Sequence, residues 1–117
     1  MSTLKVNSIE PANAGSEDYF LLRAWVNFNG VGTVSIYADG NVSSITDNNT
    51  GDYTVTLSAA ASTAYYAPIT AYGDDNGSPS SGMTGHEQPL TTSTRLYFRT
   101  GGAAAADRPF CTYAMVL

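Results

Sequence analysis

The sequence has few basic residues: five Lys and Arg stand against ten Asp and Glu, which gives a formal net charge of −5 at pH 7. Proteins that bind nucleic acids need clustered Lys and Arg side chains to neutralise phosphates. The five basic residues of this chain are scattered along it instead. We therefore expect no nucleic-acid partner.

Cysteine and long apolar runs are also scarce. Cys111 is the only cysteine, so no internal disulfide can form, and we expect its side chain to be a small buried hydrophobe. The opening MSTLKVNSIE lacks the apolar core of a signal peptide, and no stretch approaches the roughly 20 apolar residues of a membrane-spanning helix. These absences predict a chain made as a soluble cytoplasmic product, without membrane insertion.

The sequence does contain a clear period of two. In DYFLLRAWVNF, apolar residues at alternate positions share one face: Phe20, Leu22, Ala24, Val26 and Phe28. Such alternation predicts β-strands, and Gly, Asn and Asp turn signals separate the other segments that are rich in Val, Ile, Thr, Tyr and Phe. Those segments are 2–9, 33–38, 42–46, 53–58, 65–71, 94–100 and 110–116.

About eight short strands predict one all-β domain, an antiparallel β-sandwich or a jelly roll. We expect residues 1–18 to form a strand and a linker that attaches the chain or pairs with another subunit, and residues 19–117 to form the sandwich. Residues 73–92 have almost no apolar content and predict a long polar loop. Leu21 and Trp25, opposite the apolar face of DYFLLRAWVNF, exceed what a one-sided sheet needs and predict an oligomer.

The stretch NVSSITDNNTGDYTVTLS, residues 41–58, joins two strand-forming runs through a polar centre. Oxygens of Asp47, Asn49 and Asp52 would suit a hard cation such as calcium. An EF-hand loop, however, requires a closing Glu, and none follows Asp52 at the required distance. We therefore predict a hairpin with four to six connecting residues and no metal site.

A longer block, RAWVNFNGVGTVSIYADGNVSSITDNNTGDYTVTLSAA (residues 23–60), closely resembles a segment that recurs in bacteriophage tail-fibre and other virion appendage proteins. Their pattern reads A-W-V-N-F-N-G-x-G-T-V and then N-V-S-S-I-T-D-N-x-T-G-D-Y-T-V. The opening STLKVNSI and the closing FCTYAMVL are also similar to the ends of such proteins. The resemblance implies a trimeric, β-stranded virion structural protein, and it supplies no active site.

The chain departs from that family in two ways. Typical relatives end a long fibre, whereas this sequence starts at Met1 without a shaft, so we expect attachment through the N-terminal segment or a flat face. The polar stretch 73–92 lies outside the recurrent pattern, and insertions on a rigid scaffold commonly carry specificity. These features favour a small tail-fibre or tail-appendage subunit, with a capsid decoration or head-fibre protein as the alternative.

Candidate recognition residues lie in the polar stretch: Asp74, Asp75, His86 and Glu87. His86 has no second His or Cys to complete a metal set, and the chain has no G-x-S-x-G nucleophile motif. We expect no cofactor, no metal and no enzymatic activity. His86 is interpreted as a surface-loop residue, with a pH-sensitive contact inside a trimer as the alternative. The loop as a whole would contact other virion proteins or a host surface glycan or protein.

Candidate subunit contacts are Trp25, a large anchor, and Arg95, Tyr97 and Arg99, which alternate on one face of a strand. Arg is favoured at interfaces because its planar fork binds carboxylates, here the acidic residues of the polar stretch in another subunit. A solvated strand face is the alternative.

The eight tyrosines suggest a further alternative, a lectin-like glycan-binding module, because aromatic faces stack on sugars. Strand alternation predicts that Tyr37, Tyr97 and Tyr113 lie outside the core, where burial against a neighbouring subunit would explain them equally well.

Overall fold

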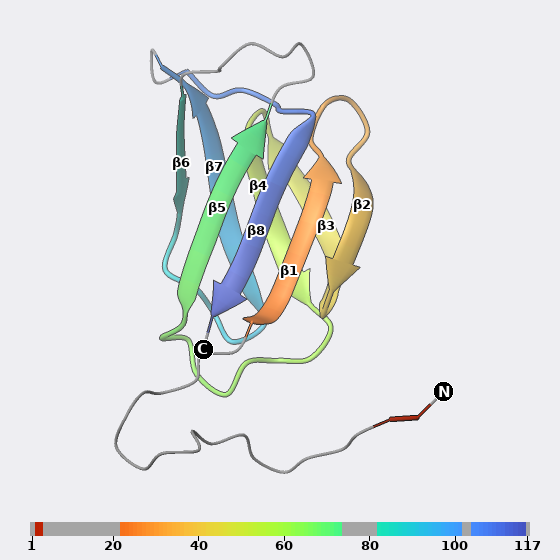
Figure 1. Cartoon of the computed structure of the whole chain (residues 1–117). Helices are drawn as coiled ribbons and strands as arrows, with labels where there is room; N and C mark the ends of the chain where they lie inside the picture. The colour runs from red at the N-terminus through yellow and green to blue at the C-terminus, as the bar shows by residue number, and fades with distance from the viewer. Residues whose placement is uncertain (1, 4–21, 74–81, 102–103, 117) are drawn as a thin grey trace, which may run out of the picture.

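The computed structural model describes residues 2–3, 22–73, 82–101 and 104–116. This part of the chain forms eight β-strands in two antiparallel sheets that pack face to face (Figure 1). One sheet has the strand order β2-β1-β8-β5 and the other β3-β4-β7-β6. The prediction of an all-β antiparallel sandwich is confirmed.

Every described strand except β6 overlaps a predicted segment. The strands are β1 (Leu22–Asn29), β2 (Ser35–Gly40), β3 (Val42–Asn49), β4 (Asp52–Leu57), β5 (Ala67–Gly73), β6 (Gly82–His86), β7 (Ser93–Thr100) and β8 (Phe110–Val116). The predicted strand and linker over residues 1–18 lie outside the described residues, apart from Ser2 and Thr3.

The prediction of one long polar loop over residues 73–92 is wrong in part. β5 extends to Gly73, and β6 is an edge strand that pairs antiparallel with β7. His86 is therefore the last residue of a strand and not a loop residue. Asp74 and Asp75 lie outside the described residues. The sequence did not indicate β6 because GMTGH has one large apolar residue, Met83, and the strand is held by backbone pairing to β7.

The core lies between the two sheets and follows the period of two. Its fully enclosed side chains come from four strands: Ala24, Val26 and Phe28 of β1, Tyr53 and Val55 of β4, Leu96 and Phe98 of β7, and Cys111, Tyr113 and Met115 of β8. Phe28 packs edge-on against Tyr53 and Phe98, with ring centroids 5.2 and 6.4 Å apart. Aromatic packing therefore links the two sheets.

Two predicted positions, Tyr113 and Leu22, are wrong, and one, Cys111, is confirmed. Tyr113 was predicted outside the core, which is wrong: it alternates with Thr112 and Ala114 and is fully buried, with its hydroxyl 3.1 Å from Thr94 Oγ1. Leu22 was expected on the core face, but a register shift before Ala24 turns it outward. Cys111 is buried as predicted, and burial raises the pKa of its thiol to about 12.

The β3–β4 hairpin is tighter than predicted, because Asn49 pairs with Asp52 and only Thr50 and Gly51 connect the strands. Gly51 adopts a φ of 64°. Its amide donates to Asp107 Oδ1 at 2.8 Å, and the Tyr53 hydroxyl donates to the same oxygen at 2.6 Å. Asp107 thus fastens the hairpin to the segment that precedes β8, and burial raises the pKa of Tyr53.

Substitutions at two glycines with the same backbone conformation test the packing of the β3–β4 hairpin. A Cβ at Gly51 (φ 64°) would collide with the Phe98 carbonyl oxygen and lie 2.7 Å from Ala106 N, whereas a Cβ at Gly32 (φ 67°) would meet nothing within 4 Å. We predict that Gly32→Ala costs roughly 1 kcal/mol through backbone strain alone. Gly51→Ala should cost at least about 3 kcal/mol in urea unfolding, and equal costs would contradict the described hairpin.

Candidate functional site

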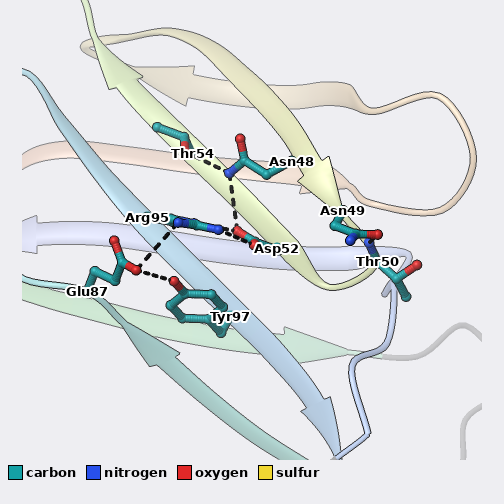
Figure 2. Close-up of polar contacts among 8 residues, drawn as sticks. All are labelled: Asn48, Asn49, Thr50, Asp52, Thr54, Glu87, Arg95 and Tyr97. Carbon is teal, nitrogen blue, oxygen red and sulfur yellow. Dashed lines mark hydrogen bonds and ion pairs between the residues drawn. The ribbon is translucent and has the colours of Figure 1, made fainter.

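The outer face of the β3-β4-β7-β6 sheet, here called the polar face, carries three of the predicted contact residues. Arg95, Tyr97 and Arg99 of β7 alternate with the buried Thr94, Leu96 and Phe98 and therefore point away from the core. Neighbouring strands add polar side chains beside them (Figure 2). The face is a lattice of charged and hydroxyl groups on a rigid sheet.

An ion pair between adjacent strands organises this face. Arg95 Nε and Nη2 donate to the two oxygens of Asp52 at 2.8 and 2.6 Å, which is a bidentate pair (Figure 2). Asn48 Nδ2 donates to Asp52 Oδ1 at 3.2 Å and to Thr54 Oγ1 at 2.8 Å. The hydrogen bond from Arg95 holds the pKa of Asp52 below its ordinary value of 3.8.

Glu87 joins the same network from the other side. Its Oε1 accepts a short hydrogen bond from the Tyr97 hydroxyl and lies 3.5 Å from Arg95 Nη1 (Figure 2). The hydrogen bond to Glu87 raises the pKa of Tyr97. The Arg95 guanidinium lies 5.4 Å from the Tyr97 ring centroid. The Tyr97 ring is therefore held by contacts at its hydroxyl and at its face.

These contacts change the interpretation of Arg95. We expected its carboxylate partners in another subunit, but Asp52 and Glu87 of the same chain occupy that role. Asp52 and Asn48 were not predicted as members of the site. Only the pairing of β3, β4 and β7 brings residues so far apart in the sequence together, and no local pattern specifies that register.

Two shallow depressions flank Tyr97 and Arg99 on the polar face. The first lies between β6 and β7 and is lined by Met83, Thr84, Gly85, His86, Tyr97 and Arg99. The second lies beside the β3–β4 hairpin and shares Tyr97 and Arg99 with the first. The structure thus gathers His86, Tyr97 and Arg99 around one hollow, with Glu87 next to it.

Trp25 lies on a different surface, the outer face of the β2-β1-β8-β5 sheet, here called the apolar face. Its indole rests against Gly40 of β2, and the strand register continues from Trp25 to Ala114 and then to Ile69. The outward side chains of the described strands here include Trp25, Asn27, Tyr37, Ala38, Ala67, Ile69, Ala71, Phe110, Thr112, Ala114 and Val116. None of these is charged. The exposed charged residues of these strands are Arg23, at the bulge where β1 begins, and Asp39 of the edge strand β2.

Several polar groups of the apolar face form hydrogen bonds within the protein. Thr112 Oγ1 donates to Asn27 Oδ1 at 2.8 Å. The Tyr37 hydroxyl donates to the Pro109 carbonyl at 3.0 Å, and its ring packs against Phe110 with centroids 5.7 Å apart. The face therefore presents mainly hydrocarbon to solvent, with the exposed amide nitrogen of Asn27 as a polar group that solvent can satisfy.

Among the residues that the structure describes, no three His, Cys, Asp or Glu side chains gather closely enough to hold a metal ion. The carboxylate of Asp52, whose oxygens would suit a calcium ion, accepts hydrogen bonds from Arg95 and Asn48 instead. No helix in the described ranges is long and apolar enough to cross a membrane.

Comparisons with protein-family models, with curated proteins and with solved structures found no significant match to this chain. The chemistry of the two faces is therefore interpreted from their own residues.

The ion pair predicts a defined pH dependence. A carboxyl whose pKa is lowered on folding adds stability above its unfolded pKa of about 3.8, and that stability is lost as the pH falls through the lower folded value. Asp52→Asn should therefore lower the Tm by a few degrees at pH 7, and the difference from the wild type should shrink below about pH 4. Thermal unfolding followed by circular dichroism across this range measures it.

Asp47→Asn is the matched control, because Asp47 lies in the neighbouring strand and forms no ion pair within the described part of the chain. It should leave the Tm nearly unchanged at pH 7. A Tm deficit of Asp52→Asn that persists undiminished at low pH would mean that the carboxylate charge does not stabilise the fold.

Proposed function

We propose that this chain is a non-enzymatic structural subunit of a bacteriophage virion, a small tail-fibre or tail-appendage component that assembles as a homotrimer and with other virion proteins. The observation that carries the proposal is the apolar face, whose centre carries no charged side chain among the described residues. The resemblance of residues 23–60 to virion appendage proteins supports the phage assignment.

The apolar face is as large as the largest apolar patches on soluble monomers, and patches of that size often mark contact sites. Four strands about 4.8 Å apart and about seven residues long at 3.3 Å each give a face of roughly 19 by 23 Å, or about 440 Å². The largest apolar patch on a typical soluble monomer measures roughly 300–600 Å² and is often functional. Ile69 and Phe110 are 53% and 47% exposed on it, so a partner surface would bury substantial hydrocarbon.

Charge favours a second copy as that partner. Two chains that each carry a net charge of −5 repel one another at charged surfaces, but the apolar face allows close approach without placing like charges together. Two such faces would bury only about 900 Å², below the roughly 1,200 Å² of a standard specific interface. A simple face-to-face pair is therefore marginal.

A closed ring uses more surface for each subunit. In a heterologous ring, the apolar face of one copy meets a different surface of the next copy, and every subunit contributes both surfaces. The edge strand β2 offers such a surface, because it ends the described sheet, Ile36 is exposed there and Val31 is exposed in the preceding turn. The family resemblance implies three copies.

The reactive groups of the described residues support a structural role. The thiol of Cys111 is enclosed and protonated at neutral pH. Asp52 and Glu87 are engaged in hydrogen bonds on the polar face. A capsid decoration protein remains the alternative, in which the apolar face would lie against the capsid shell instead of another copy.

Assembly is tested by placing a charge at the centre of the apolar face. Ala114 lies on the central strand β8, between Trp25 and Ile69. By sedimentation equilibrium at micromolar concentration, the wild type should weigh about 37 kDa, three times the 12.3 kDa chain. Ala114→Arg should be a folded monomer, because assembly would bury an unpaired charge.

Thr56→Arg is the control, since Thr56 lies on β4, where alternation with the buried Val55 and Leu57 points its side chain away from the core on the polar face. It should remain assembled. A wild type that stays monomeric, or an Ala114→Arg variant that still assembles, would contradict self-association through this face.

The virion assignment is tested on particles. Antibodies raised against the purified chain should label phage particles at the tail in immunogold electron microscopy. Labelling of the head would instead support the decoration alternative. Absence of the chain from purified particles, checked by mass spectrometry, would refute a virion role of either kind.

A further inference from the structure

Gly85, in the depression between β6 and β7, has no evident structural reason to be glycine. Glycine weakens the interior of a strand and is usually found where a bulge, a bend or the close approach of another group requires it. Gly82 of the same strand has such a reason, because a Cβ there would collide with the Tyr72 hydroxyl and the Arg99 carbonyl oxygen. A Cβ at Gly85 would meet nothing within 4 Å, and its φ lies outside the left-handed region.

The missing side chain leaves an open space beside an aromatic ring. Thr84 Oγ1 accepts a hydrogen bond from Thr70 Oγ1 of the other sheet at 2.8 Å, so the alternate positions Met83 and Gly85 face outward. Gly85 pairs directly with Tyr97, and both line the depression. A strand glycine of this kind marks a place where a ligand can approach the backbone.

The Tyr97 ring is held in one orientation by contacts within the protein. Its hydroxyl is fixed by Glu87, and the Arg95 guanidinium lies over the ring. An aromatic side chain that is already ordered loses little conformational entropy when a ligand packs against it. The ring therefore provides a rigid wall for a flat, partly apolar molecule.

Polar groups surround this wall at a few points. Glu87 Oε1 accepts the hydrogen bonds from Tyr97 and Arg95. Within the described part of the chain, Glu87 Oε2 accepts no hydrogen bond, so it can accept one from a ligand hydroxyl. Arg99 lines the depression as a donor, and Met83, 52% exposed, extends the apolar surface. An apolar wall with a few convergent polar groups is typical of small-molecule sites.

Charge and size narrow the ligand class. Among the described residues of this face, Arg95 and Arg99 equal Asp52 and Glu87 in number, which favours an uncharged ligand. The depression has a volume of about 290 Å³, at the lower end of the roughly 300–1,000 Å³ of ligand pockets. The second depression, about 230 Å³, lies on the other side of Tyr97 and Arg99 and could hold an adjoining unit.

We infer that the polar face binds an uncharged saccharide, with the C–H face of one pyranose ring stacked on Tyr97 above Gly85 and its hydroxyls bonded to Glu87 and Arg99. An open, shallow site of this kind binds one sugar ring weakly. Several copies on one assembled particle would multiply that affinity.

The test is a titration followed by ¹H–¹⁵N correlation spectra of the intact chain. The probes are methyl glycosides of glucose, galactose, mannose and N-acetylglucosamine. At least one should shift the amides of β6 and β7 saturably, with a Kd in the millimolar range. No saturable shift with any of the four, or shifts confined to other strands, would overturn the inference.

Substitutions separate the parts of the site. Gly85→Val fills the depression with a residue that suits a strand and should weaken binding about tenfold or more. Tyr97→Ala should abolish binding, and Tyr97→Phe, which keeps the ring, should weaken it less. Gly73→Val is the matched control: Gly73 ends a strand of the other sheet, where a Cβ would make an ordinary contact, and binding should be unchanged. Sugar shifts that Gly85→Val leaves intact would overturn the assignment.

The saccharide site stands independently of the proposed assembly. Ala114→Arg alters the opposite face, so it should keep its sugar-dependent shifts even as a monomer. If β6 and β7 amides instead shift with protein concentration alone, and Gly85→Val removes that effect, the polar face is a contact between copies and the saccharide inference fails.

Discussion

Burial of one face of each sheet is the constraint on which this structure depends. Alternation on β1, β4, β7 and β8 sends Phe28, Tyr53, Phe98 and Tyr113 into one shared core, and the same alternation sends every other side chain outward. The core therefore leaves two outer faces whose chemistry is not dictated by folding. One carries an ion-pair network and the other carries hydrocarbon, which is the basis for assigning them different roles.

The positions of the side chains on the polar face depend on hydrogen bonds that fix the β3–β4 hairpin. Asp107 binds both the Gly51 amide and the Tyr53 hydroxyl, and Phe98 N donates to the Gly51 carbonyl at 2.8 Å. These bonds fix the hairpin against β7 and so set Asp52 opposite Tyr97 and beside Arg95. A slip of one residue would turn Arg95 and Tyr97 into the core. Register, more than the surface side chains themselves, creates the site.

Sequence patterns could predict whatever is local. The period of two located Ala24, Val26 and Phe28 in the core. The burial of Cys111 was predictable because a free cysteine usually behaves as a small buried hydrophobe. The pairing of Arg95 with Asp52 depends on long-range register, and β6 depends on backbone bonds to a neighbour, so neither was predictable from neighbouring residues. A structural explanation for Gly85 could be sought only once its surroundings were known.

Hydroxyl-radical footprinting of the assembled wild type and of the Ala114→Arg variant measures directly which of the two faces is covered on assembly. We expect the oxidation of Trp25, Tyr37 and Phe110 to fall on assembly, because the apolar face is then covered. Met83 and Tyr97, on the polar face, should be oxidised to the same extent in both samples. Protection of Met83 and Tyr97, with Trp25 and Phe110 unprotected, would show that assembly covers the polar face and would contradict self-association through the apolar face.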